Sequence, residues 1–523
     1  MATGLKDMLG RVPMAADLYD VVRGGRPRTR YNLDQLVEHV QAAAEQVQPF
    51  VRRAPRGKKL LLFATLHYWI EQAVMVGLAL RGRGHDVTIA YLPYSSLAGE
   101  INAFDLRRQD LYTRRVLQPL KDLIRTVSLL DVLPVDPQPA WTAEVVDTSA
   151  AYDTMYQMQV EDVSRDSKLF QLRTRRNRSA LLAGLRLLAV ERPEAVLLPN
   201  GLVTELAVMY QAARRMGLDT VTYEFNDQRE QIWLAQNDVV MHQNTDALWE
   251  ARGRLPLTGS QRQTIAELEE ARSQARKYGK GTRFWQDVAR LGGEQLRNDV
   301  GLDQRPVVLL ATNVLGDSLT LGRHVFADSM AAWIEKTVQY FAKRPDVQLV
   351  VRVHPGERLM KGPSITGVIQ RALPARLEHI HIIGPSEKIN TYDLMEIASL
   401  GLAYTTTVGM EMAMRCVPVV VAGNTHYRGR GFTFDPSSWE EYYGLLDKIL
   451  LDLPAHRLSP EQVELAWNYA YRFFFEYPLD FPWRLMHFWK DLEVWPLSRV
   501  LSAEGEERFG QAFRCLAGEP RAW

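Results

Sequence analysis

The stretch from Lys59 to Leu92 reads KLLLFATLHYWIEQAVMVGLALRGRGHDVTIAYL. Its first run, Lys59 to Ala64, is apolar after the leading lysine, and a second apolar run spans Val87 to Leu92. A helix-like segment from Tyr68 to Arg81 lies between them. Nearly continuous apolar strands joined by a helix are typical of a parallel sheet that is covered on both faces. The stretch therefore predicts the opening of a doubly wound α/β domain.

The same alternation of strand and helix continues along the chain. It resumes at Ala195 to Pro199 and at Thr220 to Phe225, after a charged region, 102–184, in which we expect inserted helices. A second series begins at Pro306, and its strand-like runs are 307–311, 347–353, 379–383, 401–405 and 417–422. Two such series predict two Rossmann-like domains that face a ligand cleft at the carboxyl ends of their strands.

These two series set the predicted domain boundaries. An N-terminal helical segment occupies 1–57 and includes an amphipathic helix from Asn32 to Val47. The first α/β domain, with helical insertions, spans 58–300, and the second spans 301–455. Within the first domain, 258–280 is interpreted as a solvated helix with Ser260 as its cap. The aromatic-rich tail, 456–523, predicts helices that pack across both domains.

Composition and charge exclude several classes of protein. Hydrophobic residues make up 46% and charged residues 24% of the 523 residues, which excludes disordered and fibrous chains. A net charge of +1 provides no global field for nucleic acid, so a bound phosphate must be held by local groups. Two cysteines exclude a disulfide framework, and the sequence contains neither a leader-like apolar run in residues 1–13 nor a membrane-spanning one. We expect a cytoplasmic location, with peripheral contact at the inner face of the membrane as the second option.

The sharpest chemical signal is Val350 to Glu357, VVRVHPGE. An apolar strand ends here in Arg352 and His354, and Pro355 then rigidifies the turn. An imidazole at the carboxyl end of a strand can donate a hydrogen bond to a phosphate or act as a general acid. Taken alone, the pair favours a half-buried histidine that bonds to backbone, and it is the segments after it that point to a ligand site.

A second polar segment follows about fifty residues later, where Ala403 to Cys416 reads AYTTTVGMEMAMRC. Thr405, Thr406 and Thr407 stand where a strand passes into a helix, and hydroxyls with free backbone N–H groups can bind an anion there. Glu411 lies one turn into that helix, where a carboxylate can bind ribose hydroxyls. The alternative is a helix cap with a first-turn dipole partner.

A third segment, Pro418 to Gly431, reads PVVVAGNTHYRGRG. Its glycines allow close backbone approach, and Arg428 and Arg430 offer planar donors suited to a diphosphate or an acidic sugar. A plain surface loop is the alternative interpretation.

In this order the segments resemble the donor-binding half of bacterial capsular and surface polysaccharide glycosyltransferases. His-Pro is followed by NTYDL at Asn390 to Leu394, by TTTVGME, and by PVVV with Tyr427. The sequence is similar to GT-B enzymes in which a His-Pro motif and a Ser/Thr motif hold a nucleotide sugar, as in the Kdo- and sialic-acid-transferring groups. Ala311 to Asp317, ATNVLGD, also resembles the Thr-Asn loop that opens this domain in capsule synthesis proteins. The likeness covers about 306–439, with weaker support over 200–236, and departs from the best-known members in having threonines where serines are frequent.

The resemblance implies an inverting glycosyltransferase of hexosyl, Kdo or sialyl type. Its donor would be a CMP- or UDP-linked sugar, and its acceptor a surface glycan or a lipid-linked saccharide. It implies that His354 and Thr405 to Thr407 bind the donor phosphate and that Glu411 takes the ribose. Arg352, Arg428 and Arg430 complete the predicted nucleotide-sugar site. No further cofactor, no metal and no nucleic acid is expected.

An inverting transfer needs a base for the acceptor hydroxyl and donors for the leaving phosphate. The first domain is expected to supply the base, with Asp227 or Glu224 in YEFNDQRE as first choice and His67 as second. Two alternatives remain open, a nucleotide-sugar epimerase of the same fold and a non-catalytic polysaccharide assembly protein. The sequence contains no GxxxxGK[ST], HExxH or GxSxG motif.

Overall fold

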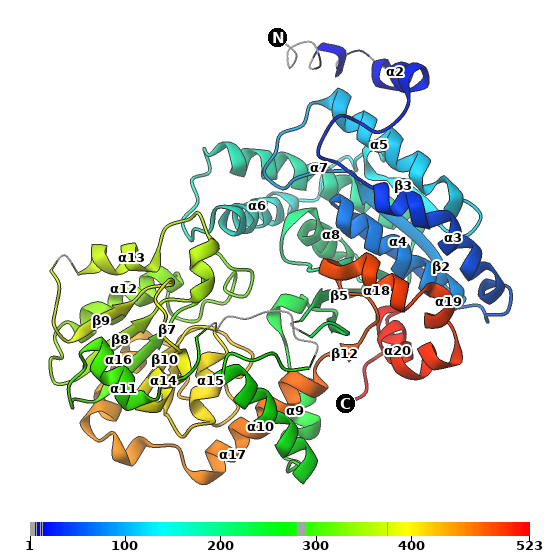
Figure 1. Cartoon of the computed structure of the whole chain (residues 1–523). Coiled ribbons are helices and arrows are strands. Elements are labelled where there is room, and N and C mark those ends of the chain that lie inside the picture. Colours follow the sequence, from blue (N-terminus) through cyan, green and yellow to red (C-terminus); the bar gives the residue numbers. More distant parts are fainter. Residues whose placement is uncertain are drawn as a thin grey trace. The chain divides into compact units, whose positions relative to one another are not determined.

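The computed structural model describes residues 6, 8–10, 12, 14–226, 228–279, 288–373 and 375–523. The chain forms two compact units, whose elements are shown in Figure 1. Unit 1 contains Met1–Asp153, Ser164–Met241 and Leu479–Ala522, and unit 2 contains Thr154–Val163, His242–Pro478 and Trp523. Each unit is built on its own β-sheet, so the predicted α/β class with two Rossmann-like domains is confirmed.

Unit 1 has a seven-stranded sheet with the order β12-β6-β5-β4-β1-β2-β3. The strands are β1 (Lys59–Thr65), β2 (Asp86–Leu92), β3 (Arg125–Ser128), β4 (Ala195–Pro199), β5 (Asp219–Phe225), β6 (Gln231–Gln236) and β12 (Leu479–Asp480). The strands from β5 to β3 are parallel, whereas β6 runs antiparallel to both of its neighbours. The four runs predicted from the first half of the sequence correspond to β1, β2, β4 and β5.

The sequence does not predict the other three strands of this sheet. β3 reads RTVS and is buried only at its last residue, so it lacks a continuous apolar pattern. The helices expected in 102–184 are present, but the region also contains β3, which the sequence does not predict. β6 is defined by its register with β5, and β12 adds two residues from a distant part of the chain. Strands at a sheet edge are partly solvated and do not require apolar residues at every position.

Helices surround this sheet. They are α2 (Ala15–Arg23), α3 (Asp34–Val51), α4 (His67–Gly82), α5 (Ala103–Leu117), α6 (Thr142–Met158, in unit 1 as far as Asp153), α7 (Lys168–Glu191), α8 (Thr204–Arg215), α18 (Phe488–Val494), α19 (Leu497–Val500) and α20 (Ala503–Leu516). α4 is buried on nearly every side because it lies between the sheet, at β1 and β2, and α3. No helix in the described ranges is both long and apolar enough to cross a membrane.

Unit 2 has a five-stranded parallel sheet with the order β11-β10-β7-β8-β9. Its strands are β7 (Val307–Ala311), β8 (Gln348–Arg352), β9 (Ile380–Ile383), β10 (Ala398–Ala403) and β11 (Val419–Val421). Each of the five predicted runs overlaps one of these strands. β7, β8 and β11 are buried at every residue, as expected for strands with helices on both faces.

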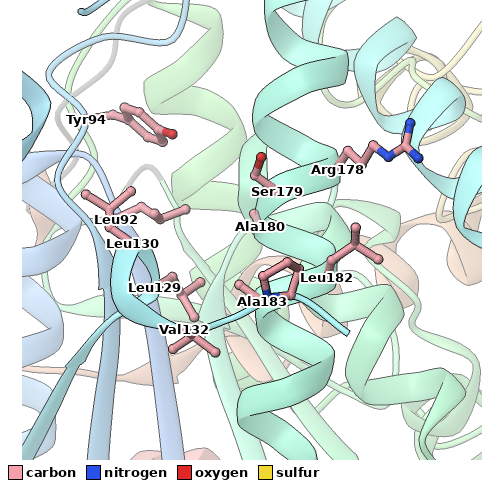
Figure 2. A pocket seen from close by; sticks show the side chains of 11 residues that line it. Leu92, Tyr94, Leu129, Leu130, Val132, Arg178, Ser179, Ala180, Leu182 and Ala183 are labelled. Carbon is pink, nitrogen blue, oxygen red and sulfur yellow. The ribbon is translucent and has the colours of Figure 1, made fainter. Parts of the chain in front are cut away.

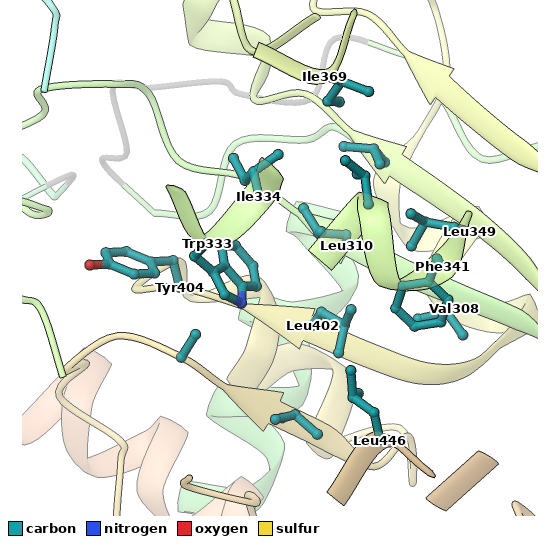
Figure 3. Close-up of a cluster of buried hydrophobic side chains, with 14 of the residues drawn as sticks. Val308, Leu310, Trp333, Ile334, Phe341, Leu349, Ile369, Leu402, Tyr404 and Leu446 are labelled. Atoms are coloured by element: carbon teal, nitrogen blue, oxygen red, sulfur yellow. The ribbon is translucent and has the colours of Figure 1, made fainter. Parts of the chain in front are cut away.

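One face of this sheet carries the main hydrophobic core of unit 2. Trp333 and Phe341 of α12 (Met330–Phe341) belong to one buried cluster with Val308, Leu349 and Leu402 from the strands (Figure 3). α13 (Ile365–Ala372) and α16 (Trp439–Leu451) add residues to the same cluster. On the other face, α15 (Val408–Ala413) packs against β10 and β11.

The remaining helices of unit 2 are α9 (Asp246–Arg252), α10 (Gly259–Ser273), α11 (Gly293–Val300), α14 (Thr391–Ile397) and α17 (Pro460–Tyr471). The predicted boundary at residue 300 therefore lies inside unit 2, which already contains α9 to α11. The predicted tail is shared, since 456–478 belongs to unit 2 and β12 joins the sheet of unit 1.

The helix expected over 258–280 exists as α10, but the prediction of its cap is wrong. The Thr258 hydroxyl accepts the backbone N–H of Gln261, and the Gln261 side chain accepts the backbone N–H of Thr258. This reciprocal capping box satisfies two N–H groups at the helix start. Ser260 is already the second helical residue.

Candidate functional site

The candidate site lies at the carboxyl edge of the sheet of unit 2. Four neighbouring parallel strands, β8, β7, β10 and β11, end at this edge, and each is followed by a loop with polar side chains. The residues that begin these loops include Thr312 and Asn313 after β7, His354 after β8, and Thr405 after β10. Ligands of open parallel sheets bind beyond the carboxyl ends of the strands.

Thr312 and Asn313 join the loops on either side of them. The Thr312 hydroxyl accepts the backbone N–H of His354 at 3.1 Å, and the Asn313 side-chain oxygen accepts the backbone N–H of Thr405 at 3.2 Å. This is possible because β7 lies between β8 and β10 in the sheet. Both side chains are buried, so these bonds hold the His354 and Thr405 loops beside each other.

Neither Thr312 nor Asn313 is among the predicted site residues, although both lie in the segment that carries the resemblance. Their position in the sequence could have identified them as site residues. They are the first two polar residues after five buried apolar ones, at the end of the central strand. Polar residues that are buried at such a place need partners in neighbouring loops.

His354 is half-buried in the turn after β8, and its Nδ1 accepts the backbone N–H of Gly356 at 3.0 Å. Because a backbone N–H can only donate, the ring carries its proton on Nε2. Burial, and the charge of Arg352 to a lesser degree, lower the pKa of His354 to about 4. The ring is therefore neutral at neutral pH, and its chemistry there is that of a hydrogen-bond donor rather than a general acid.

The three threonines follow β10 and differ in their surroundings. Thr406 accepts the hydroxyl of the buried Tyr427 on its carbonyl at 2.6 Å, which fixes the loop after β11 to the loop after β10. Thr407 precedes α15 and makes no side-chain cap. The Thr405 hydroxyl oxygen is buried and has no hydrogen-bond partner among the residues that the structure describes. A buried hydroxyl in this condition costs about 1–3 kcal/mol, which a ligand oxygen or a water molecule would relieve.

The three predicted arginines have partners within the protein. The buried Arg352 donates to two backbone carbonyls beyond β9, at 2.7 and 3.2 Å. Arg428 donates to three backbone carbonyls around its own loop. Arg430 forms an ion pair with Asp246 at 2.5 Å. All three guanidinium groups thus shape the loops, and their contact with a ligand stays a prediction.

Glu411 lies in α15 and is buried. Its carboxylate oxygen is 2.9 Å from the guanidinium of Arg272 in α10, and Arg272 also donates to the hydroxyl of Tyr392 at 3.3 Å. The binding of ribose by Glu411 stays a prediction, and a ribose would have to share the carboxylate with Arg272.

His426, which is not a predicted site residue, lies buried in the loop after β11. Its Nδ1 is 2.9 Å from the hydroxyl of Tyr469, and its ring stacks on Phe473 with 3.9 Å between centroids. Burial, with the nearby charges of Arg323 and Arg430, holds the pKa of His426 well below its ordinary value. Its Nε2 has no hydrogen-bond partner in the described part of the chain. This neutral ring holds the loop against α17 and the turn that follows it.

In unit 1 two of the predicted bases, His67 and Glu224, also lie at the carboxyl edge of the sheet. His67 begins α4 after Leu66, whose φ is +67°, and burial lowers the pKa of His67. Its Nδ1 is buried and has no hydrogen-bond partner among the described residues. Glu224, on β5, accepts the side-chain amide of Asn200 at 3.3 Å. Asp227 lies outside the described residues.

A pocket of about 390 Å³ opens at the carboxyl ends of β2 and β3 in unit 1 (Figure 2). It is lined by Leu92, Tyr94, Leu129, Leu130, Val132, Pro134, Arg178, Ser179, Ala180, Leu182 and Ala183. Its volume lies in the range of small-molecule sites, and its mostly apolar lining suits an aliphatic or aromatic group. Arg176 fixes one wall, since its guanidinium lies 4.0 Å from the centroid of the Tyr94 ring and donates to the carbonyl of Ser96. The described residues contain no group of three or more His, Cys, Asp or Glu side chains that could hold a metal ion.

Comparisons with known proteins find no matching protein-family model and no matching curated protein. Among solved structures, the chain is similar to KpsC, a β-Kdo 2,4-transferase of Thermosulfurimonas dismutans, at 18% identity over 53% of this chain and 79% of that chain, with a TM-score of 0.35. It is also similar to a UDP-GlcNAc 2-epimerase of Neisseria meningitidis bound to UDP-GlcNAc, at 13% identity over 80% and 99% of the two chains, with a TM-score of 0.27. A co-structure of S. aureus MnaA with UDP matches at 12% identity over 79% and 92%, also with a TM-score of 0.27. At these values none of the three assigns a substrate or a reaction to this chain.

Proposed function

We propose that this protein is a glycosyltransferase that binds a nucleotide sugar on unit 2 and transfers the sugar to a surface glycan or a lipid-linked acceptor. The observation that carries the proposal is the pair of bonds from Thr312 and Asn313 to the His354 and Thr405 loops. These bonds hold the His354 imidazole, with its proton on Nε2, beside the Thr405 hydroxyl, which has no hydrogen-bond partner among the described residues. Donors fixed in advance suit a phosphate oxygen.

The two donors are neutral, which suits the reaction. In the proposed reaction, the bond between the anomeric carbon and the phosphate oxygen breaks, and the departing nucleotide phosphate takes the electron pair. Hydrogen bonds from His354 and Thr405 would strengthen as that negative charge develops. A neutral imidazole with a pKa of about 4 keeps this role over the whole neutral range of pH.

On the acceptor side, we assign the base to Glu224 or Asp227, with His67 as the second candidate. The base takes the proton of an acceptor hydroxyl while the oxygen attacks the anomeric carbon opposite the leaving phosphate, which inverts the configuration. Asn200 supports Glu224 by donating to its carboxylate. The apolar pocket lined by Leu92 and Leu129 would take the non-sugar part of a lipid-linked acceptor.

The first test is a calorimetric panel of CMP, CDP, UDP, GDP and ADP with the wild-type chain. A nucleotide at about 100 times its dissociation constant adds about 2.7 kcal/mol to the free energy of unfolding. We expect one nucleotide to bind and His354→Asn to weaken that binding about tenfold or more, because a hydrogen bond to a charged group is lost. The Asn side-chain oxygen can still accept the Gly356 N–H. His354→Asn therefore removes the Nε2–H donor and keeps the hydrogen bond that holds the turn. If none of the nucleotides binds, the proposal is wrong.

The second test separates transfer from binding. Glu224→Gln should bind the nucleotide with unchanged affinity and lose transfer to an added acceptor, because the amide cannot take a proton. Chromatography of the products distinguishes a glycosidic product from an epimerised nucleotide sugar. An epimerised donor, formed without any acceptor, would assign the chain to the epimerase alternative instead.

A further inference from the structure

Helix α2 of unit 1 has its two faces reversed relative to an ordinary surface helix. Its two acidic residues face the protein: Asp17 pairs with Arg107 of α5 at 2.8 Å, and the buried Asp20 pairs with Arg115 of the same helix. The Arg107 guanidinium holds the pKa of Asp17 below its ordinary value, so this pair is ionised at neutral pH. The apolar stripe of a surface helix normally faces the core and its charges face water. In α2, by contrast, the charged acidic side chains pack against the protein.

That outer face is apolar. Leu18, Val21 and Val22 lie at steps of three and four residues on one side of α2, and they are 62%, 85% and 82% exposed. Met14, directly before the helix, is also exposed. In unit 1, α2 packs mainly against α5, and both helices are labelled in Figure 1. Contiguous exposed apolar side chains on one helix face mark a surface that binds a partner.

A basic segment begins at the last residue of the helix. Arg23, Arg26, Arg28 and Arg30 all have exposed side chains. Arg26 pairs with Asp34, whereas the other three have no acidic partner among the residues that the structure describes. Apolar side chains on a helix beside unpaired cations form the chemical pattern that binds an anionic lipid surface.

We propose that α2 and the segment 23–30 dock this protein onto the surface of a membrane that contains anionic lipids. Leu18, Val21 and Val22 enter the interface between headgroups and acyl chains, and the arginines contact lipid phosphates. The ion pairs of Asp17 and Asp20 with α5 hold the helix so that its apolar face points outward. This inference is independent of the proposed glycosyl transfer, because it uses none of the residues of that site.

The test is sedimentation of the full chain with vesicles of phosphatidylcholine mixed with phosphatidylglycerol, and with vesicles of phosphatidylcholine alone. We expect binding to the mixed vesicles that weakens with rising salt, and much weaker binding to the neutral ones. One arginine near an anionic surface increases the partition coefficient onto the membrane about fivefold. The triple variant Arg23→Gln, Arg28→Gln, Arg30→Gln should therefore bind about a hundredfold more weakly. The matched control is Arg52→Gln, Arg53→Gln, Arg56→Gln, which removes the same charge from exposed positions elsewhere in unit 1.

A second triple variant tests the apolar face. Leu18→Gln, Val21→Gln, Val22→Gln should lower partitioning at least tenfold, whereas Leu133→Gln, Val190→Gln, Val494→Gln removes equally apolar exposed residues elsewhere and should leave it unchanged. Because all six positions are exposed, the unfolding temperatures should stay close to that of the wild type, which confirms that each variant is folded. Equal loss in variant and control, or no binding of the wild type to mixed vesicles, overturns the proposal. So does a wild-type dimer in light scattering that the α2 variant converts to a monomer, since a second copy would then cover the face.

Discussion

Glu71 offers a quantitative test of the electrostatics inside unit 1. It lies in α4, is buried, and accepts the indole N–H of Trp489 at 3.3 Å. Burial is the main reason why its pKa rises from an ordinary 4.5 to about 7, and the charge of Asp34 adds to the effect. The substitution Glu71→Gln replaces this carboxyl group by a neutral amide of the same shape, which can still accept from Trp489.

The size of the effect follows from the two pKa values. They differ by about 2.5, and each pKa unit corresponds to about 1.4 kcal/mol, which gives about 3 kcal/mol. Because the folded pKa is the higher one, the folded chain keeps the proton between about pH 4.5 and 7 while the unfolded chain loses it. The carboxyl group therefore contributes its full stability below about pH 4.5, and that stability is lost as the pH rises through 7. Near pH 8 the fold must hold a buried carboxylate.

Glu71→Gln should therefore be more stable than the wild type by up to about 3 kcal/mol near pH 8, and nearly equal to it near pH 4.5. The assay is urea unfolding of both proteins at the two pH values, followed by circular dichroism. Glu38→Gln, at an exposed position of α3, is the control and should leave the free energy of unfolding unchanged at both pH values. If Glu71→Gln destabilises the chain equally at both pH values, the carboxyl group is ionised throughout and the reasoning fails.

Three further substitutions test single contacts. Asn313→Ala leaves the backbone N–H of Thr405 without its acceptor and should lower the free energy of unfolding by about 1–3 kcal/mol and weaken nucleotide binding, both measurable in one calorimetric series; unchanged binding would show that this bond does not shape the site. Thr258→Ala removes the capping box of α10 and should cost about 1 kcal/mol in denaturant unfolding, whereas Thr258→Ser should retain most of it. Trp333→Ala empties the core beneath α12 and should cost about 3–5 kcal/mol, and a loss below about 1 kcal/mol would contradict the packing in Figure 3.

The central strands of both sheets could be predicted from local sequence. β4 and β7 coincide with the predicted runs, because a strand with helices on both faces must be apolar at nearly every position. His354, Thr405 and Asn313 follow such strands. Because the strands are parallel, the order of strand and helix along the chain also places these three residues at one edge of the sheet.

What local sequence could not supply is the choice of partner. The residues of β3, β6 and β12 carry little apolar pattern of their own. These segments are strands because their backbones pair with a neighbouring strand of the sheet. The same holds for the predicted arginines: Arg430 meets Asp246, which is 184 positions away in the chain.

The charges on α2 show the same division between local and tertiary information. The apolar and acidic residues of α2 lie on different sides of the helix, and such a helix ordinarily packs with its apolar face inward. Arg107 and Arg115 of α5 reverse that orientation by pairing with Asp17 and Asp20. Periodicity along a chain thus determines which side chains share a face, whereas the direction in which the face points depends on charges that only the tertiary fold brings near.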